Sequence, residues 1–207
     1  MLFRSEIKTS YVGEQGYYNI RSLYFDDYEN SCFMANENGI DNREKYRIRI
    51  YNGAKERIKL ELKQKCHGMT LKRNCGISLQ QCEMLMAGRV PSDIKEDQQV
   101  LWKLAYLMET RLMMPKIIVD YDRIPYVYRP GDANVRITFD KNIKSINDTN
   151  SFLDLKVGGR GILPVGSALM EVKFDDFIPD EIYSLLQLNG LQVSTFSKYY
   201  LCRKFAR

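Results

Sequence analysis

The stretch Lys45–Tyr51, with the sequence KYRIRIY, decides the fold class of this 207-residue chain. Along it, Arg47 and Arg49 alternate with apolar residues. Successive side chains of a β-strand point to opposite faces, so this period of two predicts a strand with one apolar face and one cationic face.

The same alternation recurs along most of the chain and predicts seven further strands. They lie at residues 18–26, 58–65, 69–73, 116–127, 135–141, 168–174 and 195–199. Asn52-Gly53 supplies the turn that would join the strand at 45–51 to the strand at 58–65 in a hairpin. Helices are predicted at residues 78–88, 97–108 and 179–188, and a capping box from Ser78 to Gln81 opens the first of them.

This pattern predicts an α+β domain. We expect an eight-stranded antiparallel sheet that can close into a barrel, with helices packed outside it. The sequence has no fixed-period repeat, low-complexity tract or proline-rich linker, so residues 1–207 are expected to form one domain.

Composition excludes several classes of protein. Hydrophobic residues make up 44% and charged residues 28%, which is typical of a globular chain. No run approaches the roughly 18 apolar residues of a membrane-spanning helix, and the N-terminus lacks the apolar core of a secretory signal, so we expect a cytoplasmic location. The five cysteines form no C-x-x-C pair, and the single histidine, His67, cannot build a multi-histidine metal site.

The polar faces of the predicted strands are mostly lysine and arginine. An ordinary solvated sheet face is the plainest interpretation. However, like charges opposite one another across strands are destabilising, and an anion would neutralise them. Isolated carboxylates (Glu61, Asp140 and Glu171) stand among these cations, as a metal ion bridging to phosphate would require. If the helices cover the apolar face, the charged face lines a tunnel for a polyanion.

Seven segments, taken in order, resemble the VTC domain. They are YNIRSLYFD (18–26), REKYRIRIY (43–51), VDYDRIPYVY (119–128), VRITFD (135–140), LMEVKF (169–174), FIPDEI (177–182) and STFSKYYLCR (194–203). This domain is the catalytic module of the vacuolar transporter chaperone polyphosphate polymerase, belongs to the triphosphate tunnel metalloenzymes, and occurs alone in bacteria. The resemblance implies an eight-stranded antiparallel tunnel with helices outside. It also implies ATP or another nucleoside triphosphate, or inorganic polyphosphate or triphosphate, as substrate, with Mn²⁺ or Mg²⁺.

The resemblance also assigns residues to roles. Arg47, Arg49, Lys63, Arg123 and Arg136 match positions that clamp phosphate during catalysis. Phosphate-binding roles are implied for Arg21, Lys72, Lys173 and Lys198, and a metal-binding role for Glu171. Arg21 could instead pair with Asp26 or Asp27. The roles of Glu61 and Asp140 stay open, and Asp140 could salt-bridge an arginine rather than bind metal.

The N-terminus departs from the family pattern, in which a strand with an E-x-K motif and then a helix precede the YNIRSLYFD strand. Residues 4–8 (RSEIK) could be placed on that opening strand with the helix deleted. We favour the ungapped placement, which puts residues 7–20 on the connection after the helix. The tunnel then lacks its first strand.

Three functions follow from the resemblance. The first is a polyphosphate polymerase that transfers the γ-phosphate of ATP to a growing chain. The second is a triphosphate or nucleoside triphosphate hydrolase, and the third is a non-catalytic polyphosphate- or nucleotide-binding module, which the short N-terminus favours. Nucleic acid is not an expected partner, because the cations alternate with carboxylates and no nucleic-acid motif is present. The chain is also expected to carry no membrane segment of its own.

Overall fold

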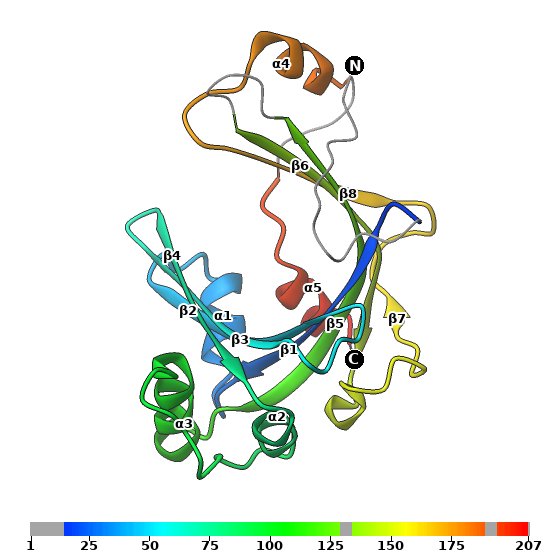
Figure 1. The fold of residues 1–207 in the computed structure, drawn as a ribbon. Helices are drawn as coiled ribbons and strands as arrows, with labels where there is room; N and C mark the ends of the chain where they lie inside the picture. The colour runs from blue at the N-terminus through cyan, green and yellow to red at the C-terminus, as the bar shows by residue number, and fades with distance from the viewer. Residues whose placement is uncertain (1–14, 129–133, 189–193, 207) are drawn as a thin grey trace.

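The computed structural model describes residues 15–128, 134–188 and 194–206. Within these ranges the chain forms eight strands and five α-helices (Figure 1). The strands are β1 (Tyr18–Asp26), β2 (Arg43–Tyr51), β3 (Ile58–Cys66), β4 (Met69–Ile77), β5 (Met114–Tyr128), β6 (Val135–Ile146), β7 (Arg160–Gly161) and β8 (Ala168–Phe174). The helices are α1 (Ser31–Glu37), α2 (Leu79–Met86), α3 (Gln99–Arg111), α4 (Asp180–Leu186) and α5 (Lys198–Lys204), with a 3-10 turn at Thr149–Ser151. The predicted α+β class is confirmed.

All strand pairs are antiparallel and belong to one sheet. The order is β4-β3-β2-β1-β5-β6, and both β7 and β8 pair with β6. The sheet curves strongly, so that one face is concave (Figure 1). Among the described residues β4 and β8 do not pair with each other, so the expected closed tunnel is instead an open, curved sheet. Residues 4–8, on which the placement of a first family strand depends, lie outside the described ranges.

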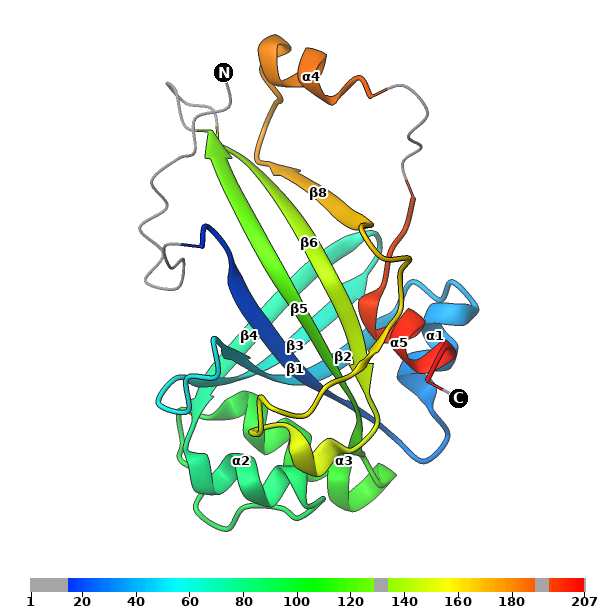
Figure 2. The same ribbon diagram turned by 90° about the vertical axis from the view of Figure 1, so that its right-hand side faces the viewer.

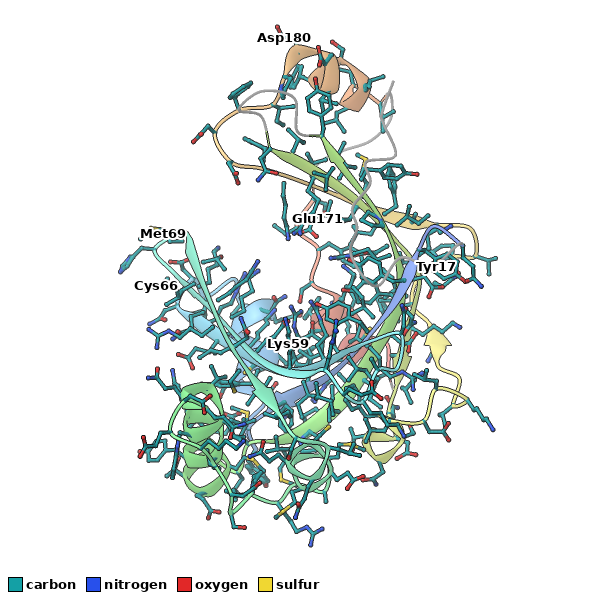
Figure 3. All side chains as sticks on the ribbon, in the orientation of Figure 1. Tyr17, Lys59, Cys66, Met69, Glu171 and Asp180 are labelled. Carbon is teal, nitrogen blue, oxygen red and sulfur yellow. The ribbon has the colours of Figure 1, made fainter. Side chains whose placement is uncertain are left out.

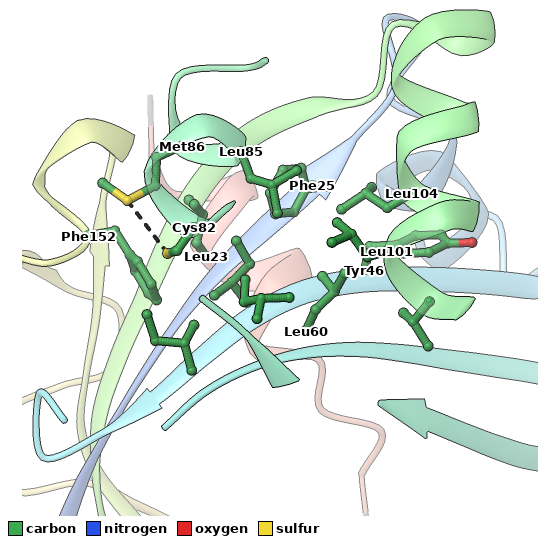
Figure 4. Close-up of a cluster of buried hydrophobic side chains, with 14 of the residues drawn as sticks. Leu23, Phe25, Tyr46, Leu60, Cys82, Leu85, Met86, Leu101, Leu104 and Phe152 are labelled. Carbon is green, nitrogen blue, oxygen red and sulfur yellow. Dashed lines mark hydrogen bonds between the residues drawn. The ribbon is translucent and has the colours of Figure 1, made fainter. Parts of the chain in front are cut away.

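The convex face is apolar, and α2 and α3 cover it. The main core cluster joins Leu23, Ile48 and Leu60 of the sheet to Leu85 of α2 and Leu101 of α3 (Figure 4). All five of these side chains are fully buried. The predicted capping box opens α2, because Ser78 Oγ accepts from Gln81 N–H and Gln81 Oε1 accepts from Ser78 N–H, both at 3.0 Å. The opposite face of the sheet carries the polar side chains, and α5 covers only an apolar part of it, around Ile117, Val119 and Ile143.

The predicted strand at residues 195–199 is wrong. These residues lead into α5, where Ser197 caps the helix by accepting a 3.3 Å hydrogen bond from Tyr200 N–H. Tyr199 and Cys202, three positions apart on the helix, are both buried. A serine cap competes with strand formation, and an apolar spacing of three fits a helix. Helix α5 packs against β5, β6 and α1 (Figure 2).

Helix α1 was not predicted. It is only seven residues long, and its N-cap, Asn30, adopts a left-handed conformation and makes no side-chain capping bond. The usual sequence signs of a helix start are therefore absent.

At the other end of the molecule, α4 lies beyond β6 and β8, where Ile182 packs against Val135 and Ile137 (Figure 2).

Candidate anion-binding face

Nearly all of the predicted site residues lie on the concave face of the sheet, which we call the inner face. Strand register and ion pairs place there Arg47, Arg49, Lys63, Lys72, Arg123, Arg136, Glu171, Lys173 and Lys198. They come from six strands and from α5. Figure 3 shows Glu171 of β8 and Lys59 of β3 on the concave side of the curved sheet. Residues distant in sequence thus form one cationic surface.

At the centre of the inner face, two arginines share one carboxylate. Arg47 donates to Glu61 Oε2 through Nε at 2.7 Å and lies 2.6 Å from it through Nη2, while Arg49 Nη1 lies 3.7 Å from the same oxygen. Arg47 also donates to the Tyr24 hydroxyl at 2.9 Å, and Arg49 to Ser22 Oγ at 3.2 Å. Burial raises the pKa of Glu61, but the two guanidinium charges outweigh it and hold that pKa below its usual range. The carboxylate therefore stays ionised and fixes both arginines.

A second carboxylate, which is buried, holds two further cations. Asp140 is fully buried and accepts two hydrogen bonds from Arg123, at 2.6 and 2.8 Å. Lys198 Nζ of α5 lies 2.6 Å from Asp140 Oδ2, the oxygen that also accepts from Arg123 Nη2. Burial raises the pKa of Asp140, but Arg123 and Lys198 lower it below the usual value. Asp140 is thus occupied by ion pairs, which favours its salt-bridge interpretation over metal binding.

Charges on β3 and β4 interact across the concave face with charges on β8. Burial lowers the pKa values of Lys63 and Lys72, the nearby cations Arg47 and Lys173 lower them further, and Glu171 partly offsets these effects. Glu171 pairs with Lys173 at 3.1 Å and lies 3.7 Å from Arg123. Within the described ranges, neither Lys63 nor Lys72 has a carboxylate at ion-pair distance. These lysines therefore carry positive charges that no ion pair within the described part of the chain neutralises.

The inner face as a whole carries an excess of positive charge. Among the residues predicted for the site, eight cations stand with three carboxylates, Glu61, Asp140 and Glu171, which leaves five positive charges, and Lys45 and Lys59 lie on the same face. Like charges held this close repel one another, and arginine forks match the geometry of phosphate oxygens. The arrangement is suited to binding an extended anion with several negative charges.

Arg21 does not belong to this group. It lies on the opposite face of β1, where it pairs with Asp120 and donates to the carbonyl oxygens of Asp154 and Val157 at 2.6 and 3.4 Å. Its side chain is 4% exposed. The structure therefore places Arg21 away from the predicted phosphate-binding face. It also shows Asp120, and not Asp26 or Asp27, as the ion-pair partner of Arg21. The alternation along the strand does predict this placement, because Arg21 lies two residues from the core residue Leu23 and so on the same face.

Arg21 lines a cavity of ≈ 370 Å³ on that opposite face, together with Asp120, Asp122, Lys144 and the loop from Leu155 to Gly159. The cavity is separated from the inner face by the sheet itself. It holds two carboxylates beside its cations, and Arg21 and Asp120 already satisfy each other. We therefore place the candidate anion site on the inner face.

Sequence reasoning missed several inner-face residues. Tyr121 lies at a bulge of β5, with its ring centroid 4.9 Å from Lys198 Nζ and 5.4 Å from Arg123 Cζ. Lys45 donates to Asn36 Oδ1 at 2.8 Å and to Ser197 Oγ at 3.0 Å. Burial and the nearby cations Arg43 and Lys63 lower the pKa of Lys45 to about 8. The alternation of Lys45 with apolar residues did predict which face of the sheet it lies on. The bulge at Tyr121, in contrast, cannot be recognised in the sequence.

The inner face offers little to a resident metal ion. The described residues contain no group of three or more histidine, cysteine, aspartate or glutamate side chains able to hold one. Glu171 is the most exposed of the three inner-face carboxylates, at 40%. Mg²⁺ is often bound by one or two carboxylates together with substrate phosphates. Glu171 therefore fits a divalent ion that arrives on a phosphate chain.

Comparison with known proteins identifies the family. A family model for the VTC domain matches residues 3–206, almost the whole chain. The chain belongs to the VTC domain family. No curated protein matches this VTC domain.

Among solved structures, the chain is similar to a Bacillus halodurans protein described as a candidate adenylate cyclase. The TM-score is 0.52 and the sequence identity 14%, and the match covers 94% of this chain and 85% of the other. At that identity the likeness shows a shared fold. Separately, no helix in the described part of the VTC domain is both long and apolar enough to span a membrane.

Proposed function

We propose that this VTC domain is a polyphosphate polymerase that uses ATP as its phosphoryl donor. The observation that carries the proposal is the excess of five positive charges among the predicted inner-face residues, where Lys63 and Lys72 lie near Lys173 and have no carboxylate at ion-pair distance in the described part of the chain. A linear chain of phosphates is an anion of the right shape and charge for a curved surface with cations along its whole extent. Membership of the family supports the same substrate class.

The proposed reaction needs no protein nucleophile. A terminal oxygen of the polyphosphate chain attacks the γ-phosphorus of ATP and forms the new P–O bond. The bond from that phosphorus to the bridging oxygen of the β-phosphate breaks, and ADP leaves with the electron pair. Phosphoryl transfer requires mainly positioning and charge stabilisation from the protein. This agrees with a chain that contains one histidine.

The inner-face cations divide this work. Arg47 and Arg49, held by Glu61, would clamp the phosphate oxygens at the centre of the face. Arg123 and Lys198, held by Asp140, would do so from the β5–β6 side. The remaining cations, Lys63, Lys72, Arg136 and Lys173, would extend the binding surface along the phosphate chain.

A divalent cation, Mn²⁺ or Mg²⁺, is the proposed cofactor. When bound, it would neutralise charge on the phosphate oxygens during transfer. Glu171 is the proposed protein ligand, because it is the inner-face carboxylate with the most exposed side chain.

Hydrolysis is the second candidate reaction, and the electrostatics of the face argue against it. A protein carboxylate that activates water as a general base works best with a pKa near the working pH. The pKa values of Glu61, Asp140 and Glu171 are all lowered by neighbouring cations. Each is therefore a weak base near neutral pH, whereas a phosphate chain already carries its own nucleophilic oxygen.

The test is incubation of the purified chain with ATP, Mn²⁺ and a short polyphosphate primer. Polymer length is read on a gel, and ADP, free phosphate and cyclic AMP are measured in parallel. The polymerase would be supported if one ADP appears for each phosphate added to the polymer and if both products are lost in Glu171→Gln. Free phosphate without polymer would indicate the hydrolase, and cyclic AMP would indicate a cyclase. Triphosphate binding without any product would indicate the binding module.

A charge-matched pair of variants shows whether the inner face is the site. Lys63→Ala removes an unneutralised inner-face cation, and Lys95→Ala removes an exposed cation from the loop before α3. We expect Lys63→Ala to weaken triphosphate binding about tenfold, since a charged contact contributes on the order of 1.5 kcal/mol. Lys95→Ala should leave binding unchanged. Equal effects of the two variants would refute the assignment of the site.

A further inference from the structure

A buried carboxylate outside the inner face, Asp26, joins three elements. It lies at the end of β1 and is fully buried. Its Oδ1 accepts from the N–H groups of Asp27 and Cys32, at 3.0 and 2.8 Å, and its Oδ2 accepts from Phe33 N–H at 3.0 Å and from the Tyr199 hydroxyl. No cation lies at ion-pair distance from Asp26 in the described part of the chain. A buried carboxylate is costly unless hydrogen-bonded, so these four donors form a firm junction of β1, α1 and α5.

The junction continues to the inner face through two tyrosine rings. Tyr199 stacks on Tyr24, with centroids 5.0 Å apart, and Tyr24 accepts the 2.9 Å hydrogen bond from Arg47. Burial and the neighbouring Asp26 charge raise the pKa of Tyr199, which keeps its hydroxyl protonated and donating to that carboxylate. The position of the Tyr199 ring therefore depends on Asp26, and Arg47 rests on the ring that Tyr199 supports.

The two residues before Tyr199 also reach the inner face. Ser197 Oγ accepts from Lys45 Nζ at 3.0 Å, and Lys198 Nζ lies 2.6 Å from Asp140. Three consecutive residues of α5 and its cap thus make contacts that place cations. Helix α5 has only seven residues, and the buried carboxylate of Asp26 holds its first turn through the Tyr199 hydroxyl.

We propose that Asp26 and Tyr199 are positioning residues, which hold the first turn of α5 so that Lys198 and Arg47 present their charges on the inner face. Neither residue touches the anion in this arrangement. The proposal explains why two separate segments, LYFD at 23–26 and SKYY at 197–200, meet in the fold. It rests on the proposed function only in taking triphosphate as the ligand.

The variant that tests it is Tyr199→Phe, which removes the hydroxyl and keeps the stacked ring. We expect triphosphate affinity to fall about three- to tenfold, which is less than the loss expected when a charged hydrogen bond to the anion itself is removed, because the effect reaches the anion only through Lys198 and Arg47. The matched control is Tyr200→Phe. Tyr200 is the next residue, and its hydroxyl accepts from Lys204 on the exposed side of α5. This control should bind triphosphate as the wild type does.

A double-mutant cycle separates positioning from general loosening of the fold. If Tyr199 acts partly through Lys198, then Tyr199→Phe should cost less affinity in a Lys198→Ala background than in the wild type. An undiminished effect would overturn the part of the proposal that concerns Lys198. Thermal unfolding of each variant confirms that the proteins compared are folded.

A second measurement does not depend on ligand binding. Acylation of lysines by an amine-reactive ester, mapped by peptide mass spectrometry, reports how firmly each amine is held. The side chain of Lys198 is 14% exposed and that of Lys204 49%. In Tyr199→Phe, and also in Asp26→Asn, we expect Lys198 to react several-fold faster relative to Lys204.

The two measurements distinguish the possible failures. Unchanged Lys198 labelling together with unchanged affinity in Tyr199→Phe would overturn the positioning proposal and leave the proposed function intact. If the wild type binds no triphosphate, the proposed function fails, and the labelling alone decides the positioning proposal. Faster labelling of Lys198 would then support it, and unchanged labelling would refute it.

Discussion

Replacing Asp140 with asparagine tests whether the inner face is built around ionised carboxylates. Three charge-assisted hydrogen bonds end on Asp140: two from Arg123, at 2.6 and 2.8 Å, and one from Lys198 at 2.6 Å. The side chains of these two cations are only 12% and 14% exposed. In Asp140→Asn, both cations would keep their charge and lose the anion that compensates it.

The size of the effect follows from this geometry. Breaking a buried ion pair from one side costs about 3–5 kcal/mol. Asparagine keeps one acceptor oxygen, so we expect the lower end, about 3 kcal/mol of unfolding free energy. For a chain of this length, about 2–4 °C of melting temperature corresponds to each kcal/mol, which gives a decrease of about 6–12 °C. Circular dichroism during thermal and urea unfolding measures both quantities, with the exposed Asp93→Asn as control.

The pH dependence of the stability difference between the wild type and Asp140→Asn shows whether the ionised carboxylate causes it. The pKa of Asp140 is lower in the folded protein than its ordinary value of 3.8. A group with a lowered folded pKa contributes stability above its unfolded pKa and loses it as the pH falls through the folded pKa. The stability gap between wild type and Asp140→Asn should therefore be full at neutral pH and should shrink below about pH 4. A variant within about 0.5 kcal/mol of the wild type at neutral pH would refute the reasoning.

Three further predictions follow from other parts of the structure. Because the pKa of Lys45 is lowered to about 8, triphosphate affinity should fall between about pH 7 and about pH 9, and Lys45→Met should remove that step in a binding titration. Gly159→Ala should destabilise the fold by about 1–3 kcal/mol, because a Cβ there would lie 2.7 Å from both Ser145 O and Ile146 Cγ1. Its triphosphate affinity, measured by calorimetry, should stay that of the wild type, since this loop lies on the opposite face. Chelation of divalent ions should abolish polymer formation but leave measurable triphosphate binding, since the inner-face cations remain.

The strands could be predicted because burial on one face imposes a period of two. Tyr18–Asp26 and Ala168–Phe174 form strands at the predicted residues. The alternation also assigned Arg47 and Lys63 to one face without knowledge of the pairing. Arg21 shows where the alternation and the resemblance disagree. The alternation places Arg21 on the same face as the core residues Leu23 and Phe25, whereas the resemblance implied a phosphate-binding role.

What alternation cannot predict is the partner of each charge. It places Glu61 and Asp140 among cations, but metal binding and ion pairing are both compatible with that placement. The choice depends on distances across strands and from a helix, such as the 2.6 Å contact between Lys198 and Asp140. Lys198 lies 58 residues along the chain from Asp140, and no local pattern connects them.

The segment around Ser197 shows why the site depends on tertiary structure. As a strand, residues 195–199 would direct Lys198 and Tyr199 to opposite faces of the sheet. As the first turn of α5, the same residues bring Lys198 to Asp140 and the Tyr199 hydroxyl to Asp26. Three donors to the buried carboxylate of Asp26 come from the chain around α1, and the fourth, the Tyr199 hydroxyl, comes from α5. This junction with Asp26 therefore favours the helix, and the helix in turn places Lys198 on the inner face.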